Sequence, residues 1–177
     1  HIIAFGTAQR IFRLLIAPIA ALSMAIKPIV GQNYGFGEYK RIRLSLNYAF
    51  QISIIIGTVL LAILYILREV LGNIFGIASD QMEVFVRILL LTSILFPIYG
   101  VHHITVSYFT ALGKAKQALL LNLLKQVIFL IPLIFILSGI FGVYGLFMAL
   151  PMADLLTIGI SIYMFRRDIS KLGEIGR

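Results

Sequence analysis

Long runs of apolar side chains constrain this chain more than any other feature. Hydrophobic residues make up 60% of its 177 residues and charged residues only 12%, and the mean hydropathy is +1.03. A water-soluble domain must cover its surface with polar side chains, so it is not this apolar. Several runs reach or approach the ~20 residues that a helix needs to cross the ~30 Å hydrocarbon core of a bilayer. The sequence therefore predicts an all-α, polytopic membrane protein.

The apolar runs predict five membrane-spanning helices. Their expected ranges are roughly 3–30, 45–67, 84–111, 118–137 and 145–165, followed by a tail at 166–177. Because the chain begins with His1 and carries an odd number of spans, we expect further spans upstream. The chain contains no cysteine, so neither a disulfide framework nor a thiolate site is expected within it.

Positive charge gathers in three of the connections, and the net charge is +8. The basic residues that follow the first, third and last spans are Lys40, Arg41, Arg43, Lys114, Lys116, Arg166, Arg167, Lys171 and Arg177. Cytoplasmic loops carry an excess of Lys and Arg, so we expect these connections and the C-terminus to be cytoplasmic. Nucleic acid is not an expected partner, because the first basic turn offers no stacking platform beyond Tyr34 and Tyr39.

The stretch PIVGQNYGFGEYKRIR, residues 28–43, separates the first two spans. A phosphate-binding loop of the Walker type needs Lys and then Ser or Thr directly after its last glycine, whereas Glu38 and Tyr39 follow Gly37. The stretch is therefore expected to be a turn at the membrane face. Its sequence resembles the loop of multidrug and toxic compound extrusion (MATE) transporters, in which a span ends in a proline, a small glycine-containing cluster follows and a basic residue opens the next helix.

Three later segments extend this resemblance in the same order. FPIYG (96–100) and SYFTALGKAKQALLLNLLKQVIFLIPL (107–133) are similar to the family's third-from-last and penultimate spans, and GVYGLFMALPMADLL (142–156) is similar to its last span. The resemblance implies that the chain, residues 1–177, is a part of the C-terminal lobe. In this family two six-helix lobes pack as a V around a central cavity, and the chain would supply spans eight to twelve.

The resemblance also implies a function. MATE transporters are secondary active antiporters that export amphipathic, often cationic organic compounds in exchange for protons or sodium ions. We therefore expect a multi-pass plasma-membrane protein, bacterial or archaeal, that is not an enzyme and needs no cofactor beyond the coupling ion. Its expected partners are the bilayer, small organic cations and an N-terminal lobe of the same protein. Two alternatives stay open: a lipid-linked oligosaccharide flippase of the related superfamily, and a non-transporting scaffold or gene remnant.

Polar side chains inside the spans are costly and are therefore candidates for function. Several polar residues follow Pro97 in the third span, most of them on one broad face: Tyr99, His102, His103, Ser107 and Thr110. A polar stripe beside a proline is typical of a helix that lines a water-filled cavity. Either histidine could bind substrate or transfer a proton, since imidazole titrates near neutral pH. The alternative is a pair of packing histidines with hydrogen-bonded ring nitrogens.

The last two spans are expected to form a hairpin with charges at matching depth. Asn122, Lys125 and Gln126 share one face of the fourth span, and Asp154, Thr157 and Ser161 share one face of the fifth. Lys125 and Asp154 differ in depth by only ~5 Å at a rise of 1.5 Å per residue, so we expect their side chains to meet. Two interpretations stay open: a structural ion pair, or an Asp154 that accepts and releases a proton.

By resemblance, some subgroups of the family carry acidic coupling residues in the seventh and tenth spans. The third span of this chain, which corresponds to the tenth, has no acid beyond Glu83 at its start. A sodium site in this lobe is therefore not expected, and coupling through the other lobe stays open.

Two further groups could face a cavity. Arg10 and Arg13 lie three residues apart near the expected external start of the first span, against the positive-inside bias, so we expect them to reach the interface or line a cavity. Aromatic and Met side chains could bind flat organic cations by stacking or cation–π contact. Examples are Phe109, Phe129, Phe135, Phe147 and Met148. Most of them are expected to face lipid or neighbouring helices, so none is singled out as a ligand.

Overall fold

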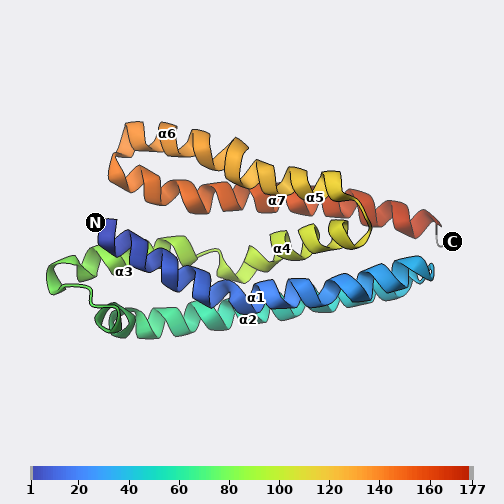
Figure 1. Cartoon of the computed structure of the whole chain (residues 1–177), viewed down its shortest axis with the longest axis horizontal. Coiled ribbons are helices and arrows are strands. Elements are labelled where there is room, and N and C mark those ends of the chain that lie inside the picture. The colour runs from blue at the N-terminus through green and yellow to red at the C-terminus, as the bar shows by residue number, and fades with distance from the viewer. Residues whose placement is uncertain (1, 176–177) are drawn as a thin grey trace.

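The computed structural model describes the backbone of residues 2–175 and the side chains of residues 4–172. Figure 1 shows an elongated bundle of helices, with the two ends of the chain at opposite ends of its long axis. The elements are α1 (Ile2–Gly35), α2 (Tyr39–Ile74), a 3₁₀ turn (Ser79–Gln81), α3 (Met82–Ser93), α4 (Phe96–Ala111), α5 (Ala115–Leu123), a π-helical segment (Leu124–Leu130), α6 (Ile131–Phe141) and α7 (Val143–Ile175). The described residues contain no strand, so the all-α prediction is confirmed.

Four of these helical segments are long and apolar enough to cross a membrane on their own: α1, α2, the continuous segment from α5 to α6, and α7. The pair α3 and α4 meets the same criterion jointly, with a bend of 46° between its halves. The described chain therefore has five spans when the bent pair is counted as one. The helices also extend beyond the apolar runs, because polar residues at their ends continue the helical hydrogen bonding.

The turn after the first span is shorter than the sequence predicts. α1 continues past the expected end at Val30 as far as Gly35. Gly31 lies inside this extension, and a Cβ at that position would stand 3.5 Å from the carbonyl oxygen of Ala111 in α4. Packing against α4 thus keeps the segment helical. The chain reverses direction at Gly37, whose φ of 72° suits glycine.

The third span is broken between Ser93 and Phe96, and Pro97 stands in the first turn of α4. Proline is favoured in the first turn of a helix because it has no N–H to donate. This turn lies directly against Gly57 of α2, where any Cβ would overlap the backbone of Phe96. Glycine at this position therefore allows the two backbones to touch.

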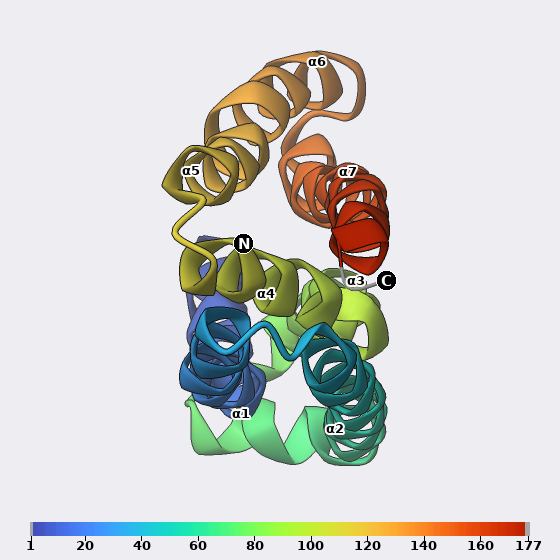
Figure 2. The same cartoon turned by 90° about the vertical axis from the view of Figure 1, so that its right-hand side faces the viewer.

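Two apolar cores lie toward opposite ends of the bundle. One is built around Tyr108 and Phe109, and the other around Phe85, Phe96 and Phe147. In Figure 2, α3 and α4 lie in the middle of the molecule, with α1 and α2 on one side and α5, α6 and α7 on the other. The polar residues of the spans lie between the two cores.

Candidate functional site

A cavity of about 230 Å³ lies between α1, α3, α4, the π-helical segment and α7. Its lining residues are Gln9, Phe12, Arg13, Ile16, Thr92, Tyr99, His103, Lys125, Leu130, Leu150, Ala153 and Asp154. Each of the five elements contributes at least one polar or charged side chain, and apolar side chains complete the lining. Such convergence of polar groups in a largely apolar cavity is typical of a ligand site.

Lys125 and Asp154 form an ion pair in the wall of this cavity. The Lys125 Nζ atom lies 2.7 Å from Asp154 Oδ1 and donates a hydrogen bond of 2.5 Å to the hydroxyl of Tyr99. The two side chains are only 22% and 11% exposed. A buried ion pair is tolerated only when further hydrogen bonds satisfy its members, and Tyr99 supplies one. The expected contact between the fourth and fifth spans is thus confirmed.

The ring of Tyr99 contacts the ammonium group of Lys125. Its Nζ lies 4.4 Å from the centroid of the Tyr99 ring, and Phe12 meets Tyr99 edge-on at 5.6 Å between centroids. The aromatic residues named from the sequence lie elsewhere. Phe109 and Phe147 are buried in the two cores, Phe135 and Met148 are exposed, and Phe129 is not among the lining residues.

The backbone that carries Lys125 is wound as a π-helix from Leu124 to Leu130. Pro132 follows in the first turn of α6 and has no N–H to donate to the carbonyl of Ile128, four residues back and inside this segment. The wider winding relieves that conflict and occurs frequently at functional sites. Hydrophobic periodicity does not reveal it, so the sequence predicts an ordinary helix here.

The two histidines have different surroundings. His102 is buried and its Nδ1 lies 3.1 Å from Ser161 Oγ, so it joins α4 to α7. His103 lines the cavity and stacks on Tyr99 with 5.1 Å between ring centroids. Its Nε2 is buried and has no hydrogen-bond partner within the described residues. His103, rather than His102, is therefore the histidine that lines the cavity.

The remaining polar candidates are not lining residues of the cavity. Ser107 is buried, but Thr110 is exposed and bonds to its own helix, so the polar face of the third span is not continuous. Asn122 and Gln126 are also exposed and do not line the cavity, although they share a helix face with Lys125 in an ordinary α-helix. The π winding changes this spacing.

The wall of the cavity that α1 forms was not predicted as a whole. Gln9, Phe12, Arg13 and Ile16 of α1 line it, at the i, i+3, i+4, i+7 spacing of one helix face. Both arginines are exposed, and Arg13 fulfils the cavity expectation, whereas Arg10 is not a lining residue. The spacing of Gln9 and Arg13, four residues apart, was the signal in the sequence. Two such residues among apolar neighbours do not distinguish a cavity-lining face of a helix from its other faces.

Residues 2–136 match the sequence profile of the MatE family. A protein named "FAD transporter" from Shewanella oneidensis is 28% identical over 166 residues, which are 94% of this chain and 36% of that protein. The solved structure of the MATE multidrug transporter DinF-BH in complex with R6G is 34% identical, with a TM-score of 0.85, and the match covers 93% of this chain and 37% of that one.

The fold is also shared with more distant solved structures. A MATE structure in the bent conformation superimposes with a TM-score of 0.91 at 18% identity, over 98% of this chain and 38% of that one. The chain thus spans between one third and two fifths of the length of the relatives that it matches.

Proposed function

The chain belongs to the MATE family of transporters, and we propose that it is part of a secondary active antiporter that exports organic compounds across the plasma membrane. The observation that carries the proposal is the ion pair of Lys125 and Asp154 in a cavity wall within the spans. Ionisable groups at membrane depth are costly and mark ion or substrate pathways. In this proposal the chain supplies part of the C-terminal lobe, and the C-terminus is cytoplasmic.

The coupling step would take place at Asp154. While its carboxylate is ionised, it compensates the ammonium of Lys125 and holds α7 to the π-helical segment. Protonation would leave that ammonium with the Tyr99 hydroxyl alone as a close partner. Removing one member of a buried pair is strongly unfavourable, so a proton would bind more tightly to a state with a rearranged cavity. Such differential affinity is what a coupling ion needs to shift an alternating-access equilibrium.

Sodium is the other coupling ion that the family allows. No group of three or more His, Asp or Glu side chains with metal-binding proximity occurs in the described part of the chain. Sodium coupling would need several oxygen ligands, backbone carbonyls among them, whereas proton coupling can use the single carboxylate of Asp154.

The first candidate cargo is a flat organic cation, as in multidrug efflux. Phe12 and Tyr99 offer aromatic rings in the cavity, and cations are attracted to such faces. The unpaired Nε2 of His103 could accept a hydrogen bond from a cargo N–H. The multidrug transporter DinF-BH, at 34% identity, supports this candidate.

The second candidate cargo is an aromatic organic anion. The cavity is lined by two cations, Arg13 and Lys125, and by one acid, Asp154. Once the ion pair is formed, Arg13 is left to attract negative charge, and Arg binds phosphate groups well. The relative named "FAD transporter" supports this class. A flippase for lipid-linked pyrophosphates would use the same cations.

Efflux measured from cells that express the complete protein distinguishes the cationic cargo from the anionic cargo. Ethidium efflux that collapses when a proton uncoupler is added, and persists when sodium is withdrawn, would support proton-driven multidrug export. FAD accumulation in the medium without ethidium efflux would support the anionic cargo. Neither transport despite membrane insertion would contradict both and favour the flippase or a non-transporting role.

The Asp154→Asn variant tests the coupling residue in the same cells. We expect it to abolish uphill export at unchanged expression, because the amide no longer carries the proton. The matched control is Asn122→Ala on the exposed face of α5, which should export like the wild type. Normal uphill export by Asp154→Asn would contradict the role proposed for Asp154.

A further inference from the structure

A second cavity, of about 220 Å³, lies between α4, α5 and α7, near the C-terminal end of α7. Phe109 of α4 lies among its lining residues, together with Gln117 of α5 and Tyr163, Arg167 and Lys171 of α7. Figure 2 views this end of the molecule and shows α5 and α7 standing apart above α4. We call this cavity the wedge, and its lining residues include the cations Arg167 and Lys171.

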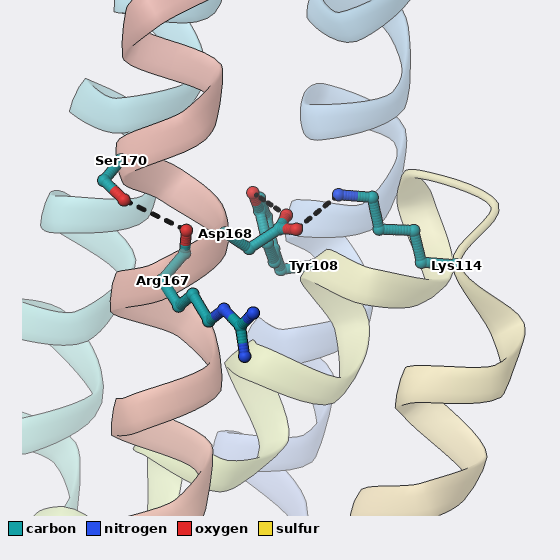
Figure 3. A network of polar contacts seen from close by, with 5 residues as sticks. All are labelled: Tyr108, Lys114, Arg167, Asp168 and Ser170. Carbon is teal, nitrogen blue, oxygen red and sulfur yellow. Dashed lines mark hydrogen bonds and ion pairs between the residues drawn. The ribbon is translucent and has the colours of Figure 1, made fainter.

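The one acidic residue of this cavity is already engaged. Asp168 Oδ1 lies 2.5 Å from Lys114 Nζ, and Asp168 Oδ2 accepts a hydrogen bond of 2.8 Å from the hydroxyl of Tyr108. These contacts join the ends of α4 and α7 across the turn that precedes α5 (Figure 3). The carboxylate is thus neutralised by Lys114 and leaves the other cations of the cavity uncompensated.

Arg167 is the cation that stays available. In Figure 3 its guanidinium extends apart from the Asp168 carboxylate, and the dashed contact at Arg167 belongs to its backbone carbonyl, which accepts from Ser170 Oγ. The guanidinium makes no ion pair or hydrogen bond within the described residues. A guanidinium offers five donors in a planar fork that fits phosphate oxygens two at a time.

The position of the cavity indicates the kind of anion. It lies at the end of the bundle that carries the basic turns, and Arg43 donates a 2.9 Å hydrogen bond to the carbonyl of Ile169 nearby. Tyr163, one of the lining residues, is 65% exposed, and Leu120 and Leu123 of α5 are exposed one to two turns further along the helix than Gln117. Tyr and Arg at a span end are typical of the headgroup region, and the apolar surface further along α5 suits an acyl chain. The geometry fits an amphipathic anion better than a free ion.

We propose that this wedge binds the phosphate of an anionic phospholipid, with the guanidinium of Arg167 as the main phosphate contact. Lys171 and Gln117 stand in the same lining and provide further donors. The bound lipid would fill the space between α5 and α7 at their shared end. The proposal is independent of the transported compound, because it uses none of the residues of the first cavity.

Lipid binding to the purified complete protein tests the proposal directly. Native mass spectrometry with phosphatidylglycerol should show a bound lipid, and phosphatidylcholine should bind at least about tenfold more weakly, because the anionic headgroup carries the attraction. Arg167→Gln should weaken phosphatidylglycerol binding about tenfold, the loss expected for one charge-assisted bidentate contact.

Arg166→Gln is the matched control, because Arg166 is an exposed neighbour of the same charge that does not line the cavity. We expect it to bind phosphatidylglycerol within about twofold of the wild type. Equal losses in the two variants, or equal binding of the two lipids, would overturn the proposal. Displacement of the lipid by an equal concentration of inorganic phosphate would also overturn it, in favour of a free-anion site.

Discussion

The ammonium group of Lys125 meets two oxygen atoms inside the bundle, one on Asp154 and one on Tyr99. An isolated charge at this depth would cost several kcal/mol, and its partners reduce that cost. The same contacts make the group responsive, because the arrival of one proton changes the balance of charge. A buried polar cluster of this kind is therefore both a structural joint and a candidate switch.

The energetic dependence within the pair can be measured. Lys125→Met should lower the free energy of unfolding by about 3 kcal/mol, because it leaves the Asp154 carboxylate without a counter-ion. The double variant Lys125→Met with Asp154→Leu should recover most of that loss, since no charge remains buried. Thermal unfolding of the detergent-purified complete protein provides the comparison. Equal destabilisation in the single and double variants would contradict the interpretation of a coupled pair.

Two elements depart from regular helix geometry, and both border the first cavity. The third span bends by 46° where α3 meets α4, and the fourth span contains the π-helical segment of Leu124–Leu130. Each departure lies close to a proline, Pro97 in one case and Pro132 in the other. The freed backbone groups can be satisfied inside a bundle, so membrane helices tolerate such breaks.

The close approach of α2 to α4 at Gly57 can be tested by substitution. Gly57→Ala should destabilise the protein by about 1–3 kcal/mol, because its Cβ would overlap the backbone of Phe96. Gly139→Ala in α6 is the matched control, with no atom within 4 Å of the added Cβ. That control should be neutral or up to about 1 kcal/mol more stable, as alanine favours helix. Thermal unfolding of both variants would decide, and equal effects would contradict the close-packing argument.

The whole molecule has one strongly basic end, where the turn between α1 and α2, the turn between α4 and α5, and the end of α7 meet. The hydrogen bond from Arg43 to the Ile169 carbonyl and the ion pair of Lys114 with Asp168 join these segments. The opposite end carries the acidic residues Asp80 and Glu83. This asymmetry predicts how the bundle sits in the membrane.

Single cysteines test this orientation, since the chain has none of its own. In a complete protein without other cysteines, Ala78→Cys between α2 and α3 should react with a membrane-impermeant maleimide added to intact cells. Ala115→Cys at the start of α5 should react only after the membrane is permeabilised. Both alanines are exposed, so access to the side chain is matched. Labelling of Ala115→Cys in intact cells would reverse the predicted topology.

Sequence alone predicts the number of spans, the basic end and the meeting of Lys125 with Asp154. Run length and charge placement are set by the thickness and polarity of the bilayer, and the hairpin contact follows from the constant rise of a helix. These properties depend on one segment, or on two segments joined by a short turn. They can therefore be worked out without knowing how distant helices pack.

Which helices complete the cavity became known only from the tertiary structure. Lipid chains are as apolar as leucine, so lipid-facing and protein-facing surfaces look alike in the sequence. Phe12 and Arg13 consequently gave little indication that they lie beside Lys125, more than 100 residues later by residue number. The packing of α4, α5 and α7 likewise sets which side chains stay free. It leaves Gln126 exposed, gives His102 and His103 separate surroundings and forms the wedge at Arg167.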